Sequence, residues 1–183
     1  MTIWERKRLE KRIGALIPRL RIITRAWGCT PDVSDDLVQE SVATALDKLS
    51  QLRNPDALEV WVIRIVTNCH RLHLRRNRFL TDLEEDQLVE EVTPASKLEN
   101  ERTLDQVRAA MGMLNDEHRK VLTLVDMEGM NYKDVAEALE IRIGTVMSRL
   151  FRARAKLRSL LEEVLKQDHS ESQKKSPTLW GVK

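Results

Sequence analysis

The stretch RIGTVMSRLFRARAKLR, residues 142–158, combines six basic residues with apolar residues at helical spacing and contains no acid. One face of its helical wheel holds Val146, Leu150, Ala153 and Leu157. The opposite face and its flanks hold Thr145, Ser148, Phe151, Arg152, Met147 and Arg149. The pattern predicts a helix that buries its apolar stripe and exposes a basic, chemically varied surface.

A second, shorter helix precedes this stretch. Asn131 is a predicted cap for a helix that ends near Leu139, and a turn of three or four residues follows. This layout is typical of a helix-turn-helix, whose second helix enters the DNA major groove. Arginines can pair with guanine edges or phosphates, and Phe or Met can contact a thymine methyl. The alternative is a basic amphipathic helix in a solvated bundle, because charge runs are usually solvated faces.

Apolar residues recur at helical spacing along the chain, and no segment shows a convincing alternation of apolar and polar residues. We therefore expect an all-α protein. Its 183 residues, 42% apolar and 33% charged, suit one medium domain or two small ones. The net charge of +2 does not demand a polyanion partner, so any basic surface must come from local segregation of charge. The chain has no CxxC motif, signal peptide or membrane-spanning apolar run, which predicts a cytoplasmic protein with reduced thiols.

The first part of the chain, residues 1–79, is expected to form one small helical domain. An N-terminal helix should be kinked or restarted by Pro18, and Ser34 with the two acids after it predicts the start of a second helix. After a turn at residues 53–56, a third helix is predicted over residues 57–78. The polar face of that helix carries Arg64, Arg71, Arg75 and Arg78.

Residues 80–100 differ in composition from the segments on either side. Residues 82–91 contain six acids and no base, which predicts a flexible acidic linker. A second helical domain is expected over residues 101–166; in it, Asn115 caps a helix that ends at Gly129, and the last helix ends near Lys166. The polar tail, residues 167–183, is expected to be disordered.

Two parts of the chain carry a family resemblance. One is LNDEHRKVLTLVDMEGMNYKDVAEALEIRIGTVMSRLFRARAKLRSLL, residues 114–161. The other is DDLVQESVATALDKL, residues 35–49, followed by VWVIRIVTNCHRLHLRR, residues 60–76. The first resembles region 4, and the second region 2, of bacterial sigma factors of the extracytoplasmic-function (ECF) type, in the sigma-70 superfamily. Both matches occur in the family's order with a linker between them. The resemblance implies a factor that binds core RNA polymerase and directs promoter-specific transcription initiation.

The resemblance implies a polymerase contact in the DLVQE motif. In the family, the helix with this motif docks on clamp helices of the largest polymerase subunit, which implies contacts by Asp36, Leu37, Gln39 and Glu40. Asp36, Glu40 and Asp47 share a helix face, and an exposed acidic face suits a basic partner. Ordinary solvated carboxylates would produce the same pattern.

The resemblance also implies two DNA contacts. The helix after the polymerase-binding helix faces the minus-ten element, and the loop before it captures a flipped base of the non-template strand. In this chain the resemblance assigns these minus-ten contacts to Arg53, Asn54, Arg64, Asn68, Arg71 and Arg75. Because aromatic residues make up only 4% of the chain, we expect a pocket in the turn to matter more than base stacking. The minus-thirty-five element is assigned to Thr145, Met147, Ser148, Arg149, Phe151 and Arg152.

The helix-turn-helix turn departs from the family at Glu140, where glycine is common. A residue other than glycine in a left-handed turn costs roughly 1 kcal/mol. Either this turn has another geometry, or the protein tolerates the penalty.

Other kinds of function find little support. The chain shows no carboxylate pair, nucleophile with a base, Walker loop or dinucleotide fingerprint, so we expect no enzyme, cofactor or small-molecule substrate. Cys69, His70 and His73 could suggest a metal site, but Cys69 lies in the apolar stripe and no second cluster completes four ligands. The implied partners are core RNA polymerase, promoter DNA and an anti-sigma factor, free or anchored in a membrane. The alternative is an autonomous homodimeric helix-turn-helix regulator, which leaves the region 2 resemblance unexplained.

Overall fold

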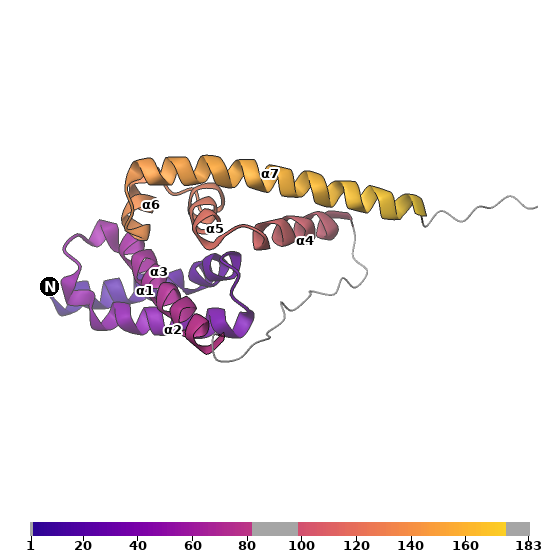
Figure 1. The fold of residues 1–183 in the computed structure, drawn as a ribbon. Coiled ribbons are helices and arrows are strands. Elements are labelled where there is room, and N and C mark those ends of the chain that lie inside the picture. The colour runs from indigo at the N-terminus through magenta and orange to yellow at the C-terminus, as the bar shows by residue number, and fades with distance from the viewer. Residues whose placement is uncertain (1, 82–98, 175–183) are drawn as a thin grey trace, which may run out of the picture.

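The computed structural model describes residues 2–81 and 99–174 of the chain (Figure 1). Within these residues there is no strand, and the all-α prediction is confirmed. The α-helices are α1 (Ile3–Ala26), α2 (Pro31–Asp47), α3 (Leu58–Thr81), α4 (Glu99–Gly112), α5 (Asp116–Leu122), α6 (Tyr132–Leu139) and α7 (Ile143–Lys174). None of the described helices combines the length and apolar composition that crossing a membrane requires.

The first three helices pack against one another. Of the two outcomes expected at Pro18, a kink or a restart, the restart does not occur, because helix α1 continues through that residue. Helix α2 begins at Pro31 rather than at Ser34, because Thr30 caps it and proline is well suited to the first helical position. The Ser34 hydroxyl instead lies 2.6 Å from the Thr24 hydroxyl, inside the contact between α1 and α2.

The helix-turn-helix begins where the capping residues predict. The Asn115 side chain accepts a hydrogen bond from the backbone of α5, and the Asn131 side chain does the same for α6. The helix expected to end at Gly129 is in fact α5 followed by a π-helical turn over Thr123–Met127. Helix α7 does not end near Lys166 but continues to Lys174. The acidic run of the expected linker, residues 82–91, lies outside the described residues, as do residues 175–183.

The second half of the chain packs on the first mainly through α6, which contacts α3, and through the π-helical turn, which contacts α1. The two halves share one apolar core (Figure 1). This core includes Ile23 and Val62 from the first half and Val121, Leu139 and Leu150 from the second. A smaller cluster, formed mainly by α4 and α7, lies entirely within the second half. The surfaces predicted to bind different parts of a promoter are therefore brought close together in this structure.

Candidate nucleic-acid and polymerase interfaces

The turn between α6 and α7 has the left-handed geometry that glycine favours. Glu140 has φ 57° and ψ 44°, and it is the only described residue other than glycine with a positive φ. The backbone N–H of Ile141 donates to the carbonyl of Ala136, which closes the end of α6. The turn therefore keeps the usual geometry, and the protein tolerates the penalty of placing glutamate there.

The outer face of α7 is open to a partner. Val146, Leu150 and Ala153 are buried, as their spacing predicts. On the opposite face, Met147 and Phe151 are 52% and 76% exposed. The other exposed or half-buried residues of this face are Thr145, Ser148 and Arg152. The exposed Met147 and Phe151 side chains can contact thymine methyls in a major groove, and the hydroxyls and the arginine beside them can read base edges.

Arg149 differs from the other residues assigned to the minus-thirty-five element. Its side chain is 23% exposed and forms an ion pair with Glu117 of α5, at 2.7 Å. Arg149 therefore points toward the inner side of the helix-turn-helix, and in this structure its charge is already paired.

Helix α2 presents an acidic surface, as the DLVQE motif implies. Asp36, Gln39 and Glu40 are exposed, whereas Leu37 is only 3% exposed. Three of the four expected polymerase contacts can thus reach a partner. Leu37 packs inside and holds α2 in place.

The residues assigned to the minus-ten element fall into two groups. Arg53 and Asn54 lie in the exposed turn before α3, where the Asn54 side chain accepts a hydrogen bond from the Asp56 backbone. Along α3, Arg64 and Asn68 are half-buried, and the Arg71 guanidinium donates to the Asn68 side chain at 3.1 Å. Arg75, also assigned to this element, is exposed one turn beyond Arg71. The assigned residues thus lie partly in the exposed turn and partly along α3.

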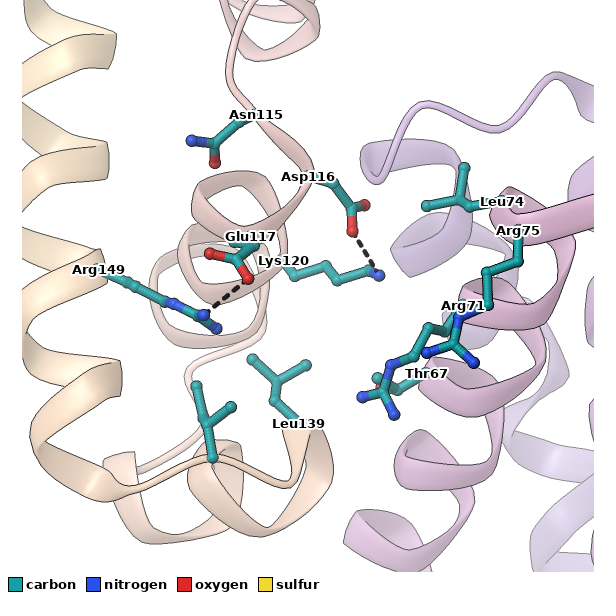
Figure 2. A pocket seen from close by; sticks show the side chains of 11 residues that line it. Thr67, Arg71, Leu74, Arg75, Asn115, Asp116, Glu117, Lys120, Leu139 and Arg149 are labelled. Carbon is teal, nitrogen blue, oxygen red and sulfur yellow. Dashed lines mark hydrogen bonds and ion pairs between the residues drawn. The ribbon is translucent and has the colours of Figure 1, made fainter. Parts of the chain in front are cut away.

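A cleft of about 550 Å³ lies between α3 and the second half of the chain (Figure 2). Arg71 and Arg75 of α3 line it on one side, and Asp116 and Glu117 of α5 line it with Arg149 of α7. The two acids are paired within the second half, Asp116 with Lys120 and Glu117 with Arg149. The cleft thus holds arginines from both expected DNA-binding sets together with carboxylates.

Next to this cleft, His70 packs in a buried cluster with Trp27 and Lys120. The sequence analysis did not predict this cluster. His70 is 2% exposed, and its ring lies 5.3 Å from the Trp27 ring. The Lys120 ammonium lies over the Trp27 ring and 2.8 Å from Asp116. Burial, together with the charge of Lys120, lowers the pKa of His70 to about 4. Within the described residues, no group of three potential metal ligands includes Cys69, His70 or His73.

Comparison with known proteins identifies the family of this chain. Residues 104–157 match the family described as Sigma-70, region 4. The ECF RNA polymerase sigma factor EcfG of Rhodopseudomonas palustris is 30% identical over 149 residues, which cover 81% of this chain and 82% of that protein. The chain belongs to the ECF sigma factors.

Further relatives of this sigma factor also match both halves of the chain. SigM of Mycobacterium tuberculosis is 32% identical over 144 residues, which cover 78% of this chain and 71% of SigM. The sigma factor RpoE of Bartonella quintana, solved with the anti-sigma factor NepR, superimposes with a TM-score of 0.74 at 26% identity and covers 85% of this chain and 98% of RpoE. These matches support a sigma factor over the autonomous helix-turn-helix regulator, which would leave the first half unexplained.

Proposed function

We propose that this sigma factor binds core RNA polymerase through the acidic face of α2 and directs it to promoters that α3 and α7 recognise. It acts as a transcription initiation factor rather than as an enzyme, and it works in the cytoplasm, where polymerase and DNA meet. The observation that carries the proposal is the outer face of α7, with exposed Met147, Ser148, Phe151 and Arg152 above a buried apolar stripe. Run-off transcription with core polymerase on a small promoter library tests it.

The two-domain division belongs to the same proposal. Residues 1–79 form the polymerase and minus-ten unit, residues 101–166 the minus-thirty-five unit, and residues 80–100 join them. Because RpoE was solved with the anti-sigma factor NepR, we include an anti-sigma factor, free or membrane-anchored, among this protein's partners.

Reversing the charge of Asp36 and Glu40 to lysine should abolish co-elution with core polymerase. Both side chains are exposed, so the fold should survive, whereas a basic clamp surface would meet repulsion in place of attraction. Gel filtration with core enzyme measures the loss, and circular dichroism checks the helix content. The matched control reverses Glu162 and Glu163, two exposed acids on α7. Co-elution of the α2 variant at the wild-type level would contradict the assignment.

Arginines of the two DNA-facing helices should differ in the step that they affect. Arg152→Ala should weaken binding of holoenzyme to duplex promoter by about 1 to 3 kcal/mol if Arg152 reads a base. Arg64→Ala and Arg71→Ala should mainly slow promoter opening, because they face the melted strand. Transcription from matched duplex templates and pre-melted bubble templates separates the two effects.

The bubble should partly rescue the α3 variants and do less for Arg152→Ala, whose proposed target stays double stranded. Lys156→Ala, an exposed substitution on the same helix as Arg152, controls for the general loss of positive charge. Equal rescue of all three arginine variants would mean that the helices are assigned to the wrong promoter elements.

A further inference from the structure

The N-terminal half of α1 carries more positive charge than its own acids balance. Residues 3–12 contain five basic residues and two acids. Both acids are engaged locally: the Glu5 carboxylate accepts a hydrogen bond from the Thr2 backbone at 2.7 Å, and Glu10 pairs with Arg6 at 2.8 Å. The rest of the basic residues in this segment are left to act on a partner.

Helical spacing gathers part of this charge on one side of α1. Leu9 and Ile13 are buried and mark the inner face of the helix. One flank of that face carries exposed side chains at positions i, i+4, i+7 and i+8, which are Trp4, Arg8, Lys11 and Arg12. We call these four residues the α1 flank. Among the described residues, neither Arg8 nor Lys11 forms an ion pair.

Arg12 joins the α1 flank to the turn at residues 53–56. Its guanidinium Nη1 donates a hydrogen bond to the Pro55 carbonyl at 3.0 Å, at the end of the molecule where the chain begins (Figure 1). A guanidinium has five N–H groups in a planar fork, so this bond leaves donors for a second partner. Arg53 and Asn54, assigned to the captured base, are exposed in the same turn. The α1 flank therefore continues the surface of that turn.

Trp4 differs from the tryptophans of the core. Trp27 and Trp61 are 2% and 8% exposed and pack against other apolar side chains, whereas Trp4 is 83% exposed. An indole in this position adds almost nothing to the stability of the fold, but it offers a partner a large flat apolar surface. The low aromatic content of the chain predicted little base stacking, and Trp4 supplies a ring outside the helix where one was expected.

The groups on the α1 flank suit a single strand of nucleic acid. Cations track the sugar-phosphate backbone, and an exposed aromatic ring provides a platform for an unstacked base. Trp4 lies eight residues before Arg12, about 12 Å along the helix at 1.5 Å per residue. The turn adds a single acid, Asp56, so the combined surface stays positive. A duplex can use the cations but not the ring, because its bases remain inside the stack.

We propose that the α1 flank binds the melted non-template strand beside the base that the turn captures. Arg8, Lys11 and Arg12 bind phosphates, and Trp4 stacks on an unpaired base. Arg12 has a second role, because its bond to Pro55 positions the turn. This inference rests on the proposed function and extends its minus-ten surface to a helix to which that function assigns no contact.

Binding of the free protein to a sequence-neutral oligonucleotide tests the α1 flank without polymerase. The probes are a labelled oligo-dT of about 16 nucleotides and a duplex of the same length. Fluorescence anisotropy at increasing salt gives the affinity for each. Arg8→Ala combined with Lys11→Ala should reduce the slope of log K against log salt by about 1.4 on the single strand, because each phosphate contact there contributes about 0.7. Arg12 stays in place because it also positions the turn.

Trp4→Ala separates stacking from charge. It should weaken binding to oligo-dT by about fivefold or more, the loss of one stacked base, and leave the affinity for the duplex unchanged. The control for charge is Arg25→Ala combined with Lys48→Ala, two exposed positions of the first half outside the α1 flank. It should leave the salt slope close to that of the wild type. No binding of oligo-dT by the wild type, an equal change of slope in the control, or an equal effect of Trp4→Ala on both probes would overturn the proposal.

The holoenzyme provides the second readout, on a promoter selected by run-off transcription. Arg8→Ala combined with Lys11→Ala should shorten the lifetime of the open complex against a competitor, while co-elution with core polymerase stays at the wild-type level. Lost co-elution would assign the α1 flank to polymerase, and an unchanged lifetime would show that it does not hold the promoter strand; either result contradicts the proposal. If the wild type forms no open complex on any promoter, the proposed function fails, and the oligonucleotide measurements still decide whether the α1 flank binds a single strand.

Discussion

Leu150→Ala is expected to lower the free energy of unfolding by about 2 to 5 kcal/mol. Leu150 is 2% exposed and belongs to the core that joins both halves, so its truncation leaves a cavity that neighbouring helices fill only in part. Urea denaturation followed by circular dichroism measures the loss. The expected value is a large part of the 5 to 15 kcal/mol that typically stabilises a domain.

Phe151→Ala is the matched control, one residue further along α7. Phe151 is 76% exposed, so its removal should change the free energy of unfolding by no more than about 0.5 kcal/mol. It should instead weaken binding to duplex promoter, where the ring can contact a thymine methyl. If Phe151→Ala proved the more destabilising of the two, α7 would have to be rotated from the position described.

Features that depend on neighbours in the sequence could be predicted from the sequence. Asn115 and Asn131 mark the starts of α5 and α6, because a capping side chain bonds to a backbone group three residues away. The buried face of α7, including Val146 and Leu150, follows from helical spacing alone. Such signals need no knowledge of the tertiary structure.

Errors arose where a tertiary contact decided the outcome. Ser34 resembles a helix cap, but its hydroxyl is used against Thr24 of α1, and Thr30 with Pro31 begins α2 instead. Leu37 belongs to a motif associated with polymerase binding; its contact with polymerase stays a prediction, but in this structure its side chain lies in the core. A motif identifies a helix, whereas the packing decides which of its residues face outward.

The contact between the halves could not be predicted at all. Trp27, His70 and Lys120 are far apart in the sequence and meet only because α3 packs between the end of α1 and α5. The pairing of Arg71 with Glu140 has the same origin. Neither periodicity nor capping contains information about such contacts. The sequence could suggest only that Glu140 is unusual in its turn.

The buried histidine leads to the second large effect, a loss of stability in acid. The free energy of unfolding should fall by up to about 3 kcal/mol as the pH drops from 6.5 to 4 because of His70. Unfolding restores the ordinary pKa of 6.5, whereas the folded pKa is about 4. Burial, Lys120, His73 and Arg119 disfavour the proton on His70, and only Asp116 favours it.

The sign follows from the protons bound in each state. Between pH 6.5 and 4 the unfolded chain binds a proton at His70 and the folded chain does not, so acid favours unfolding. Above pH 6.5 both states leave His70 neutral, and this contribution to stability is complete. Below pH 4 both states bind the proton, and the loss from His70 stops.

Comparison with His70→Gln isolates this contribution, because the carboxylates that also titrate in acid are the same in both proteins. Urea denaturation at several pH values should give a flatter pH dependence for the variant between pH 4 and 6.5, even if the variant is less stable at pH 7. His70 lies at 2% exposure between Trp27 and α5, where the halves of the chain meet. Acid should therefore weaken the contact between the halves in the wild type more than in the variant. Identical slopes for the two proteins would show that His70 is not held neutral in this cluster.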